Sequence, residues 1–259
     1  MDDIIEEVKG LKADGYQEIT LLGQNVNSYG KDLEEDYDFA TLLEEVAKTG
    51  IARIRFTTSH PWDFSREMIE IINQYDNIMP YIHLPIQSGS DNILKKMNRR
   101  YTIAEYKKLF HELKDKIPKV SITTDIIVGF PGETEEDFED TLDVVRRVNF
   151  EQVFMFIYSR RVGTPADKME NQIPEEIKHE RFDRLKQLVE GQIRNNNEKY
   201  VGTIQRVLVE GRSKTNANVL TGRTEYNKVV NFEGDDSLIG KMINLKIESE
   251  HMWYLKGAI

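Results

Sequence analysis

Cysteine is absent from the 259 residues of the sequence. The absence excludes disulfide bonds, cysteine-ligated zinc and an iron–sulfur cluster held by this chain, because each of these needs thiolate groups. The sequence also lacks a run of about 18 apolar residues, which a membrane-spanning helix would need. Its first residues, MDDIIEE, are acidic and amphipathic, unlike a signal or transit peptide. Together these features predict a cytoplasmic protein.

Positive charge is also in short supply, with 35 Lys and Arg against 45 Asp and Glu and a net charge of −10. This balance argues against a protein coated with nucleic-acid-binding charge. The charge is distributed unevenly along the chain. Residues 194–259 carry ten basic and eight acidic side chains, whereas residues 1–193 carry 25 basic and 37 acidic side chains. The last 66 residues are therefore a separate electrostatic region with a net charge of +2.

Apolar runs rich in β-formers alternate with amphipathic helical stretches over the first 190 residues. Strands are predicted at 18–22, 53–58, 81–85, 121–128 and 152–158, and helices at 39–49, 67–74, 103–116 and 135–148. Strand–helix alternation at this spacing predicts right-handed βαβ units and a parallel sheet, as in an α/β barrel or part of one. Because the chain opens with a helix, we expect an incomplete TIM-like barrel without its first strand.

The period of the pattern changes after a long charged helix predicted at 175–200. Short strands with a period of two follow at 201–210, 218–222, 228–232, 241–248 and 253–255. Five short strands in about 60 residues predict a small all-β barrel of OB-like size. We therefore expect two domains, an α/β domain at 1–193 and a β domain at 194–259.

Polar segments follow the predicted strands at the edge where α/β barrels carry their chemistry. Amide side chains lie between glycines at 22–30 (LGQNVNSYG), hydroxyls and an imidazole lie at 57–61 (TTSHP), and 87–90 reads QSGS. Glycines at 129 and 132 follow the strand at 121–128. Each segment alone is also explained by a hydrogen-bonded turn, and it is their conjunction on one rim that predicts a ligand site. The sequence shows no metal-ligand cluster and no convincing nucleophile–base set, so we predict no metal site and no catalytic residue in this chain.

The segments at 87–90 (QSGS), 96–99 (KMNR) and 125–134 (DIIVGFPGET) resemble the radical S-adenosylmethionine methylthiotransferases. The segments at 22–30 and 55–61 (RFTTSHP) resemble the branch that modifies isopentenyladenosine in tRNA. These two segments differ in the branches that act on a ribosomal protein or on threonylcarbamoyl-adenosine. The end of the chain, with VEG at 209–211 and VVNF at 229–232, resembles the TRAM domain of this family, a small RNA-binding barrel.

The resemblance implies a chemistry. One S-adenosylmethionine methylates a sulfur on an auxiliary cluster, and another is cleaved at a 4Fe–4S cluster to give a radical. The radical removes the hydrogen from carbon 2 of isopentenyladenosine next to the anticodon, and a methylthio group is inserted. The cofactor supplies the reactivity and the protein supplies placement. The implied partners are tRNA, through its anticodon stem-loop, and an electron donor.

Residue roles follow from the same resemblance. The implied cofactor-binding residues are Gly23, Gln24, Asn25, Ser59, Gln87, Ser88, Arg99, Asp125, Ile127 and Gly129. Asp125 stands where the family pattern has glycine, so we expect adenine contact there to be partly mediated by its side chain. The residues expected to meet tRNA phosphates are Arg206, Arg212, Lys214, Arg223 and Lys228.

The largest departure from the family is the missing cluster ligands. The family holds its radical cluster with a C-x3-C-x2-C segment on the first barrel strand, and its auxiliary cluster with three cysteines of an N-terminal domain. We therefore expect this chain to be a C-terminal fragment that ligates neither 4Fe–4S cluster and is inactive alone.

Two other interpretations stay open from the residues. One is a cluster-free module that binds tRNA without catalysis. The other is an unrelated barrel enzyme acting on a phosphorylated or carboxylated metabolite, for which only His60, His83 and Glu133 are candidate acids or bases.

Overall fold

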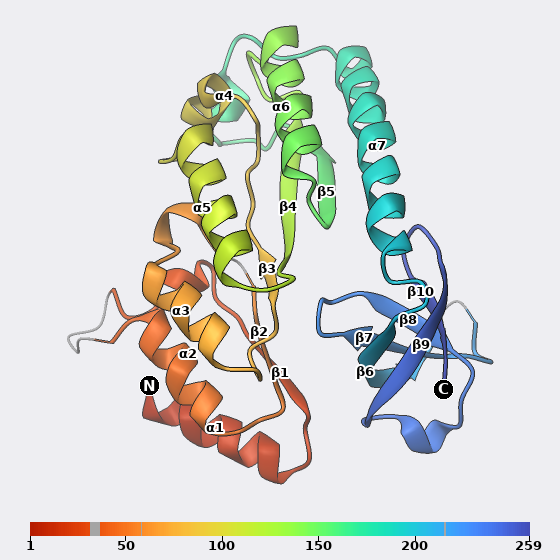
Figure 1. The fold of residues 1–259 in the computed structure, drawn as a ribbon. Helices are drawn as coiled ribbons and strands as arrows, with labels where there is room; N and C mark the ends of the chain where they lie inside the picture. Colours follow the sequence, from red (N-terminus) through yellow and green to blue (C-terminus); the bar gives the residue numbers. More distant parts are fainter. Residues whose placement is uncertain (32–36, 58, 215) are drawn as a thin grey trace. The chain divides into compact units, whose positions relative to one another are not determined.

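The structure is a computed structural model that describes residues 1–31, 37–57, 59–214 and 216–259. Thr58, which belongs to the predicted polar segment at 57–61, lies outside the described residues. Figure 1 traces the alternation of helices and strands from the N-terminus to a β-rich C-terminal region. The chain divides into a first unit, formed by Met1–Ile82, Leu113–Ser121 and Arg194–Ile259, and a second unit, formed by His83–Glu112 and Ile122–Ile193.

The N-terminal part of the first unit is a run of helices and short parallel strands. Strands β1 (Glu18–Leu21) and β2 (Arg53–Phe56) pair in parallel, with Glu18 opposite Arg53. A bridge between Ile54 and Ile78 continues the pairing beyond β2. The helical elements are α1 (Asp2–Ala13), η1 (Val26–Ser28), α2 (Phe39–Lys48), η2 (Pro61–Asp63) and α3 (Arg66–Gln74).

Local sequence explains where these helices begin. Asp38 caps α2 by accepting a hydrogen bond from Thr41 N, and Ser65 caps α3 in the same way from Met68 N. Helix α2 buries one apolar stripe against the interior of its unit, consisting of Phe39, Ala40, Leu42, Leu43, Val46 and Ala47.

The second unit is built on the parallel strands β4 (Ser121–Val128) and β5 (Gln152–Ile157), whose hydrogen-bonded sheet also includes β3 (Tyr81–His83). The helical elements of this part of the chain are α4 (Asp91–Lys96), α5 (Ile103–Lys116), α6 (Glu135–Val148), η3 (Ala166–Lys168) and α7 (Glu175–Glu198), of which α5 from Leu113 and α7 from Arg194 belong to the first unit. Strand β3 ends before Pro85, since proline has no N–H to donate to a neighbouring strand. The predicted capping pair Thr102 and Glu105 is present: the N–H of each residue donates to the side chain of the other.

The C-terminal part of the first unit is a closed five-stranded barrel with strand order β10-β8-β7-β6-β9. Its strands are β6 (Ile204–Arg212), β7 (Leu220–Thr224), β8 (Val229–Phe232), β9 (Met242–Glu250) and β10 (Leu255–Ala258), with the short η4 (Asp236–Leu238) between β8 and β9. Alternate strand residues fill the barrel: Val207, Val209, Leu220, Val230, Phe232, Leu245, Ile247 and Leu255.

Several predicted edges of these strands are wrong, among them residues 218 and 219, which precede β7 instead of belonging to it. Residues 201–203 form a turn instead of a strand, because Gly202 has φ of +81° and Thr203 N bonds to Tyr200 O. Trp253 lies in the turn before β10 and not in a strand. The class predicted from sequence is confirmed: a partial α/β barrel is followed by a small β-barrel.

Two buried arginines of β2 bond to the C-terminal barrel within the first unit. Arg53 is 1% exposed and Arg55 is 5% exposed. Their guanidinium groups donate to backbone carbonyls over 2.7–3.2 Å, and the acceptors belong to Arg206, Arg223, Thr224 and Glu225. Glu18 balances the charge, with Oε1 3.0 Å from Nε of Arg55. These bonds stabilise the contact between β2 and the barrel.

Candidate functional site

The ten predicted cofactor-binding residues divide between the two units. Gly23, Gln24, Asn25 and Ser59 belong to the first unit. The other six belong to the second unit: Gln87, Ser88, Arg99, Asp125, Ile127 and Gly129.

A cavity of about 470 Å³ in the second unit collects three of the predicted residues. This volume lies within the range of about 300–1,000 Å³ that is usual for small-molecule sites. Its lining consists of Gln87, Asp125, Ile127, Phe130, Phe156, Ile157, Tyr158, Ser159, Arg161, Thr164 and Ala166. Asp125 lies opposite Phe154 and Ile127 lies opposite Phe156, so β4 and β5 present these side chains on one face of the sheet.

Backbone geometry holds Gln87 at the rim of this cavity. Its φ is +71°, in the left-handed region that glycine favours and glutamine rarely adopts. Gln87 N donates to Asp125 O over 2.8 Å, and its carbonyl accepts from Ile127 N over 2.9 Å. Gln87 is thus locked onto β4 beside the two other predicted residues. Backbone strain of this kind is typical of functional sites.

Asp125 also contacts a histidine on the same face of the sheet. Its Oδ2 lies 3.3 Å from Nε2 of His83, and Nδ1 of that imidazole lies 2.9 Å from Thr123 Oγ1. The ring of Phe154 meets the imidazole edge-on at 5.7 Å. His83 is therefore held by two polar partners, and it orients the Asp125 carboxylate beside the cavity.

Ser88 and Arg99 have other surroundings and are not among the residues that line this cavity. Ser88 is buried, and its Oγ contacts Thr141 Oγ1 on α6 at 3.4 Å and accepts a hydrogen bond from Ser90 N. Arg99 is half-buried beyond the end of α4, where its N–H donates to Leu94 O. Both residues shape the segment that carries Gln87 into α4.

Gly129 is required by packing. A Cβ there would come within 2.4 Å of Lys178 Cγ, and its φ is +75°. Its N–H donates to Oε1 of the buried Glu133, which also accepts from Arg181. Burial raises the pKa of Glu133, although the bonds from Gly129 and Arg181 oppose that effect. This network fixes the turn at the end of β4.

In the first unit, Asn25 belongs to a polar cluster. Its Nδ2 donates to Asp63 over 2.5 Å, and Lys31 pairs with the same carboxylate. Burial disfavours ionisation of Asp63, but these hydrogen bonds outweigh it and lower its pKa. The Asn25 amide oxygen and the Ser59 hydroxyl are buried with no hydrogen-bond partner among the described residues.

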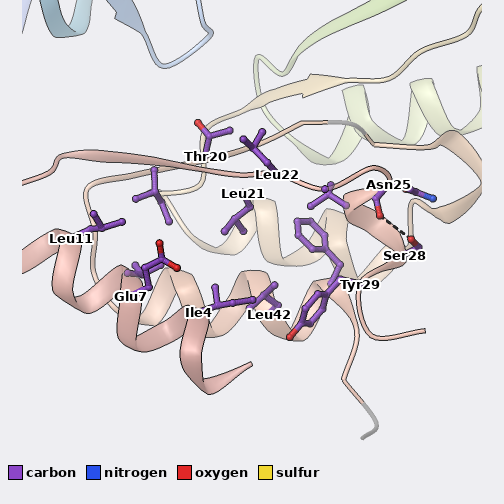
Figure 2. Close-up of a pocket in the computed structure, with 15 residues that line it drawn as sticks. Ile4, Glu7, Leu11, Thr20, Leu21, Leu22, Asn25, Ser28, Tyr29 and Leu42 are labelled. Carbon is purple, nitrogen blue, oxygen red and sulfur yellow. Dashed lines mark hydrogen bonds between the residues drawn. The ribbon is translucent and has the colours of Figure 1, made fainter. Parts of the chain in front are cut away.

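A second cavity, of about 380 Å³, lies beside this segment (Figure 2). Gly23 and Asn25 are among its lining residues, and Asn25 lies at one end, whereas Ile4, Leu21 and Leu42 belong to the largely apolar remainder. Figure 2 shows the hydrogen bond by which Ser28 Oγ donates to Asn25 O at that end, over 2.8 Å. An apolar lining suits apolar groups, and the polar atoms of the predicted site lie at its margin.

The five basic residues predicted to meet RNA are all on the C-terminal barrel or its loops, but their surroundings differ. Arg206 and Lys214 are exposed. Arg212 pairs with Asp236 at 2.9 Å, and Arg223 pairs with Glu210 at 3.0 Å. Lys228 donates to Asn197 Oδ1 over 2.7 Å.

Sequence reasoning missed the aromatic wall of the larger cavity. Phe130, Phe156 and Tyr158 line it, and the ring of Phe130 meets that of Tyr158 at 5.2 Å. The period-two alternation of FMFIY at 154–158 identifies Phe154, Phe156 and Tyr158 as one face of a strand, and Phe156 is 51% exposed. Asn27 was also missed: it is 5% exposed, and neither amide atom has a partner among the described residues.

Metal-ligating clusters and membrane-spanning helices are both absent from the part of the chain that the structure describes. No group of three or more His, Asp or Glu side chains there could hold a metal ion. No helix there is both long enough and apolar enough to cross a membrane.

Comparison with known proteins assigns the class. The family model of the radical SAM superfamily matches residues 1–145, and the TRAM domain model matches residues 198–259. The chain therefore belongs to the radical SAM superfamily, whose members use S-adenosylmethionine and a 4Fe–4S cluster.

The curated relatives are more specific. Over 100% of its length the chain is 54% identical to the tRNA-2-methylthio-N(6)-dimethylallyladenosine synthase of Acetivibrio thermocellus. It is 53% identical to the synthase of the same name from Clostridium perfringens. The chain spans only 54% and 58% of these two relatives. The resemblance to the tRNA branch of the methylthiotransferases is confirmed.

Solved structures agree on the fold. Coproporphyrinogen III oxidase from Escherichia coli aligns with a TM-score of 0.54 at 12% identity, covering 86% of this chain and 59% of that one. A radical S-adenosylmethionine methyltransferase from Kitasatospora setae aligns with a TM-score of 0.51 at 16% identity, covering 63% of this chain and 32% of the other. At these identities the likeness concerns the fold alone.

The residues present fit one of the two implied cofactors. S-Adenosylmethionine has an adenine that suits the aromatic cavity of the second unit. An iron–sulfur cluster does not fit, because the chain holds no cysteine.

Proposed function

We propose that the protein to which this chain belongs is a tRNA methylthiotransferase. It inserts a methylthio group at carbon 2 of isopentenyladenosine next to the anticodon. The observation that carries this proposal is 54% identity, along the whole chain, to a synthase named for that modified nucleoside. The aromatic cavity that contains Gln87, Asp125 and Ile127 supports it, since a flat heteroaromatic ring fits between such side chains.

The chain's own part in this activity is binding and orientation. Gln87 and Asp125 would offer an amide and a carboxylate to the adenosine part of S-adenosylmethionine, and Phe156 would cover one face of its ring. When bound at a 4Fe–4S cluster, this cofactor supplies radical chemistry, which ordinary acid–base side chains cannot supply.

Both 4Fe–4S clusters of the family need thiolates that this chain does not contain. We therefore propose that the cluster ligands belong to another part of the protein and that the chain alone is inactive. The partners of the whole protein would be tRNA, bound through its anticodon stem-loop and contacted by the TRAM domain, and an electron donor. Its place of action would be the cytoplasm.

A chimera tests the proposal. The residues of the Acetivibrio thermocellus synthase that precede its matched region are fused before Met1, and the protein is expressed in bacteria that lack their own synthase. Mass spectrometry of hydrolysed tRNA then measures methylthiolated isopentenyladenosine. We expect the chimera to produce the methylthiolated nucleoside and the 259-residue chain alone to leave isopentenyladenosine unmodified.

The relative itself, expressed in the same strain, is the positive control. A chimera that folds and carries its clusters, yet leaves tRNA unmodified while the relative is active, would overturn the proposal in favour of a tRNA-binding module. Modification by the chain alone would overturn the assignment of the clusters.

A further inference from the structure

An exposed tryptophan stands at the tip of the hairpin between β9 and β10. Trp253 is 59% exposed. The turn is closed by His251 N donating to Tyr254 O over 2.9 Å. The rings of His251 and Tyr254 stack, with centroids 4.3 Å apart and planes 15° apart. Three aromatic side chains are thus gathered in four residues on a defined turn.

A buried asparagine connects this hairpin to a lysine. Asn197 is 2% exposed, and its Nδ2 donates to His251 O over 2.8 Å and to Met252 O over 3.3 Å. Its Oδ1 accepts from Lys228 Nζ over 2.7 Å. One amide group therefore holds the Lys228 ammonium close to the backbone of the hairpin.

Further aromatic rings continue the surface from Lys228. Its Nζ lies 5.7 Å from the centroid of the Tyr200 ring, which lies 6.2 Å from the ring of Tyr226. We call His251, Trp253, Tyr254, Lys228, Tyr200 and Tyr226 the Trp253 surface. Aromatic faces beside cations are the pattern by which proteins bind single-stranded nucleic acid.

We propose that the Trp253 surface binds unstacked bases of single-stranded RNA, with Trp253 stacked on one base and Lys228 near its phosphate. The inference rests on the proposed function and deepens it. Two other cations of the barrel, Arg212 and Arg223, already pair with the carboxylates of Asp236 and Glu210, whereas Lys228 bonds to the neutral amide of Asn197. A flat indole on a tethered turn loses little freedom on binding and accepts the face of any base.

Trp253 can report its own contact. The sequence has only two tryptophans, so W62F leaves Trp253 as the one indole fluorophore. The W62F chain is titrated with an RNA hairpin that has a single-stranded loop, and separately with a fully paired duplex of the same length. We expect the hairpin to quench the fluorescence saturably and more strongly than the duplex does.

Affinity for a labelled hairpin is then measured by fluorescence anisotropy. We expect W253A to weaken binding about fivefold or more, and W253F to retain most of it, because phenylalanine keeps a stacking face. Y16A is the matched control: Tyr16 is also 59% exposed but lies before β1, and its loss should leave affinity unchanged. Circular dichroism melting checks that each variant is folded.

The outcomes separate this inference from the proposed function. If W253A is folded and binds the hairpin as tightly as the unsubstituted chain does, the proposal that the Trp253 surface binds RNA is wrong, and the proposed function stands. Equal quenching by hairpin and duplex would overturn base stacking. If the unsubstituted chain does not bind the hairpin even at low salt, RNA docking by this chain is wrong, while tRNA modification by the chimera decides the proposed function separately.

Discussion

Position 89 requires glycine because α6 lies directly against it, and not because its backbone has a positive φ. A Cβ at this position would lie 2.4 Å from Thr141 Cα and 2.7 Å from Asp140 O, both backbone atoms of α6. Its N–H also donates to Thr141 Oγ1 over 2.9 Å. The segment QSGS therefore needs glycine so that the chain following Gln87 can lie directly against α6.

Two glycines of the second unit should respond in opposite ways to replacement by alanine. Gly89→Ala should lower the free energy of unfolding by about 1–3 kcal/mol, because backbone atoms of α6 must move. Gly191→Ala should instead raise it by about 0.5–1 kcal/mol, since Gly191 lies within α7 with nothing within 4 Å of the added methyl group. Urea unfolding measures both, and a neutral Gly89→Ala would contradict the packing argument.

The second prediction concerns acid stability. Asp137 is buried, which opposes its ionisation, but hydrogen bonds from Ser90, Thr134 and Asn92 outweigh burial and hold its pKa below 3.8. A depressed pKa stabilises the fold fully above the unfolded value of 3.8, and this stability is lost as pH falls through the native value.

Asp137→Asn should therefore cost about 1–3 kcal/mol at neutral pH and should make the loss of stability below pH 3.8 shallower. Urea unfolding at a series of pH values measures this slope. Asp143→Asn is the control, because Asp143 is an exposed partner of Arg147 on the same helix and should contribute less than about 1 kcal/mol. Identical acid slopes for Asp137→Asn and the unsubstituted chain would refute the assignment.

At the scale of elements, β2 does more than pair with β1. Arg53 and Arg55 extend from it to backbone carbonyls of the C-terminal barrel, and Glu18 balances their charge. Burial lowers the pKa of Arg53, although Glu18 opposes this. A strand that ends near the predicted ligand segment thus also supports the domain predicted to bind RNA.

Arg53→Met should destabilise the first unit by about 3–5 kcal/mol, because it leaves two carbonyls and part of Glu18 without their donor in a buried place. We expect proteolysis of the C-terminal barrel to become faster, as followed by mass spectrometry of the fragments. Arg146→Met removes an exposed arginine 4.0 Å from Glu139 and should change neither stability nor cleavage by a measurable amount. Unchanged cleavage of Arg53→Met would show that the barrel does not depend on β2.

The order of elements was predictable because periodicity is a local signal. The strand at Ser121–Val128 and the helices at Ile103–Lys116 and Glu135–Val148 have the bounds expected from sequence. The predicted strand edges are wrong where a backbone dihedral angle or a hydrogen-bonded turn, and not the hydrophobic pattern, determines the secondary structure. The positive φ of Gly202 replaces strand by turn at 201–203, and the hairpin turn keeps Trp253 out of β10.

At the scale of the whole molecule, residue types pointed to the candidate site, but contacts decide which residues share a cavity. Gln87, Asp125 and Ile127 line one cavity of the second unit, and Asn25 and Ser59 supply buried polar atoms in the first. The packing of Ser88 on Thr141 and of Gly129 on Lys178 could not be predicted, because α6 and α7 approach these residues only in three dimensions.

The left-handed backbone of Gln87 has a thermodynamic consequence. Its N–H and carbonyl are both bonded to β4, so the residue is restrained before any ligand arrives. The backbone of Gln87 loses its conformational entropy when the chain folds. Binding of a ligand therefore removes little more of it. Gln87→Gly should relieve the backbone strain and should weaken binding of the ligand proposed for this cavity, so that stability rises while affinity falls.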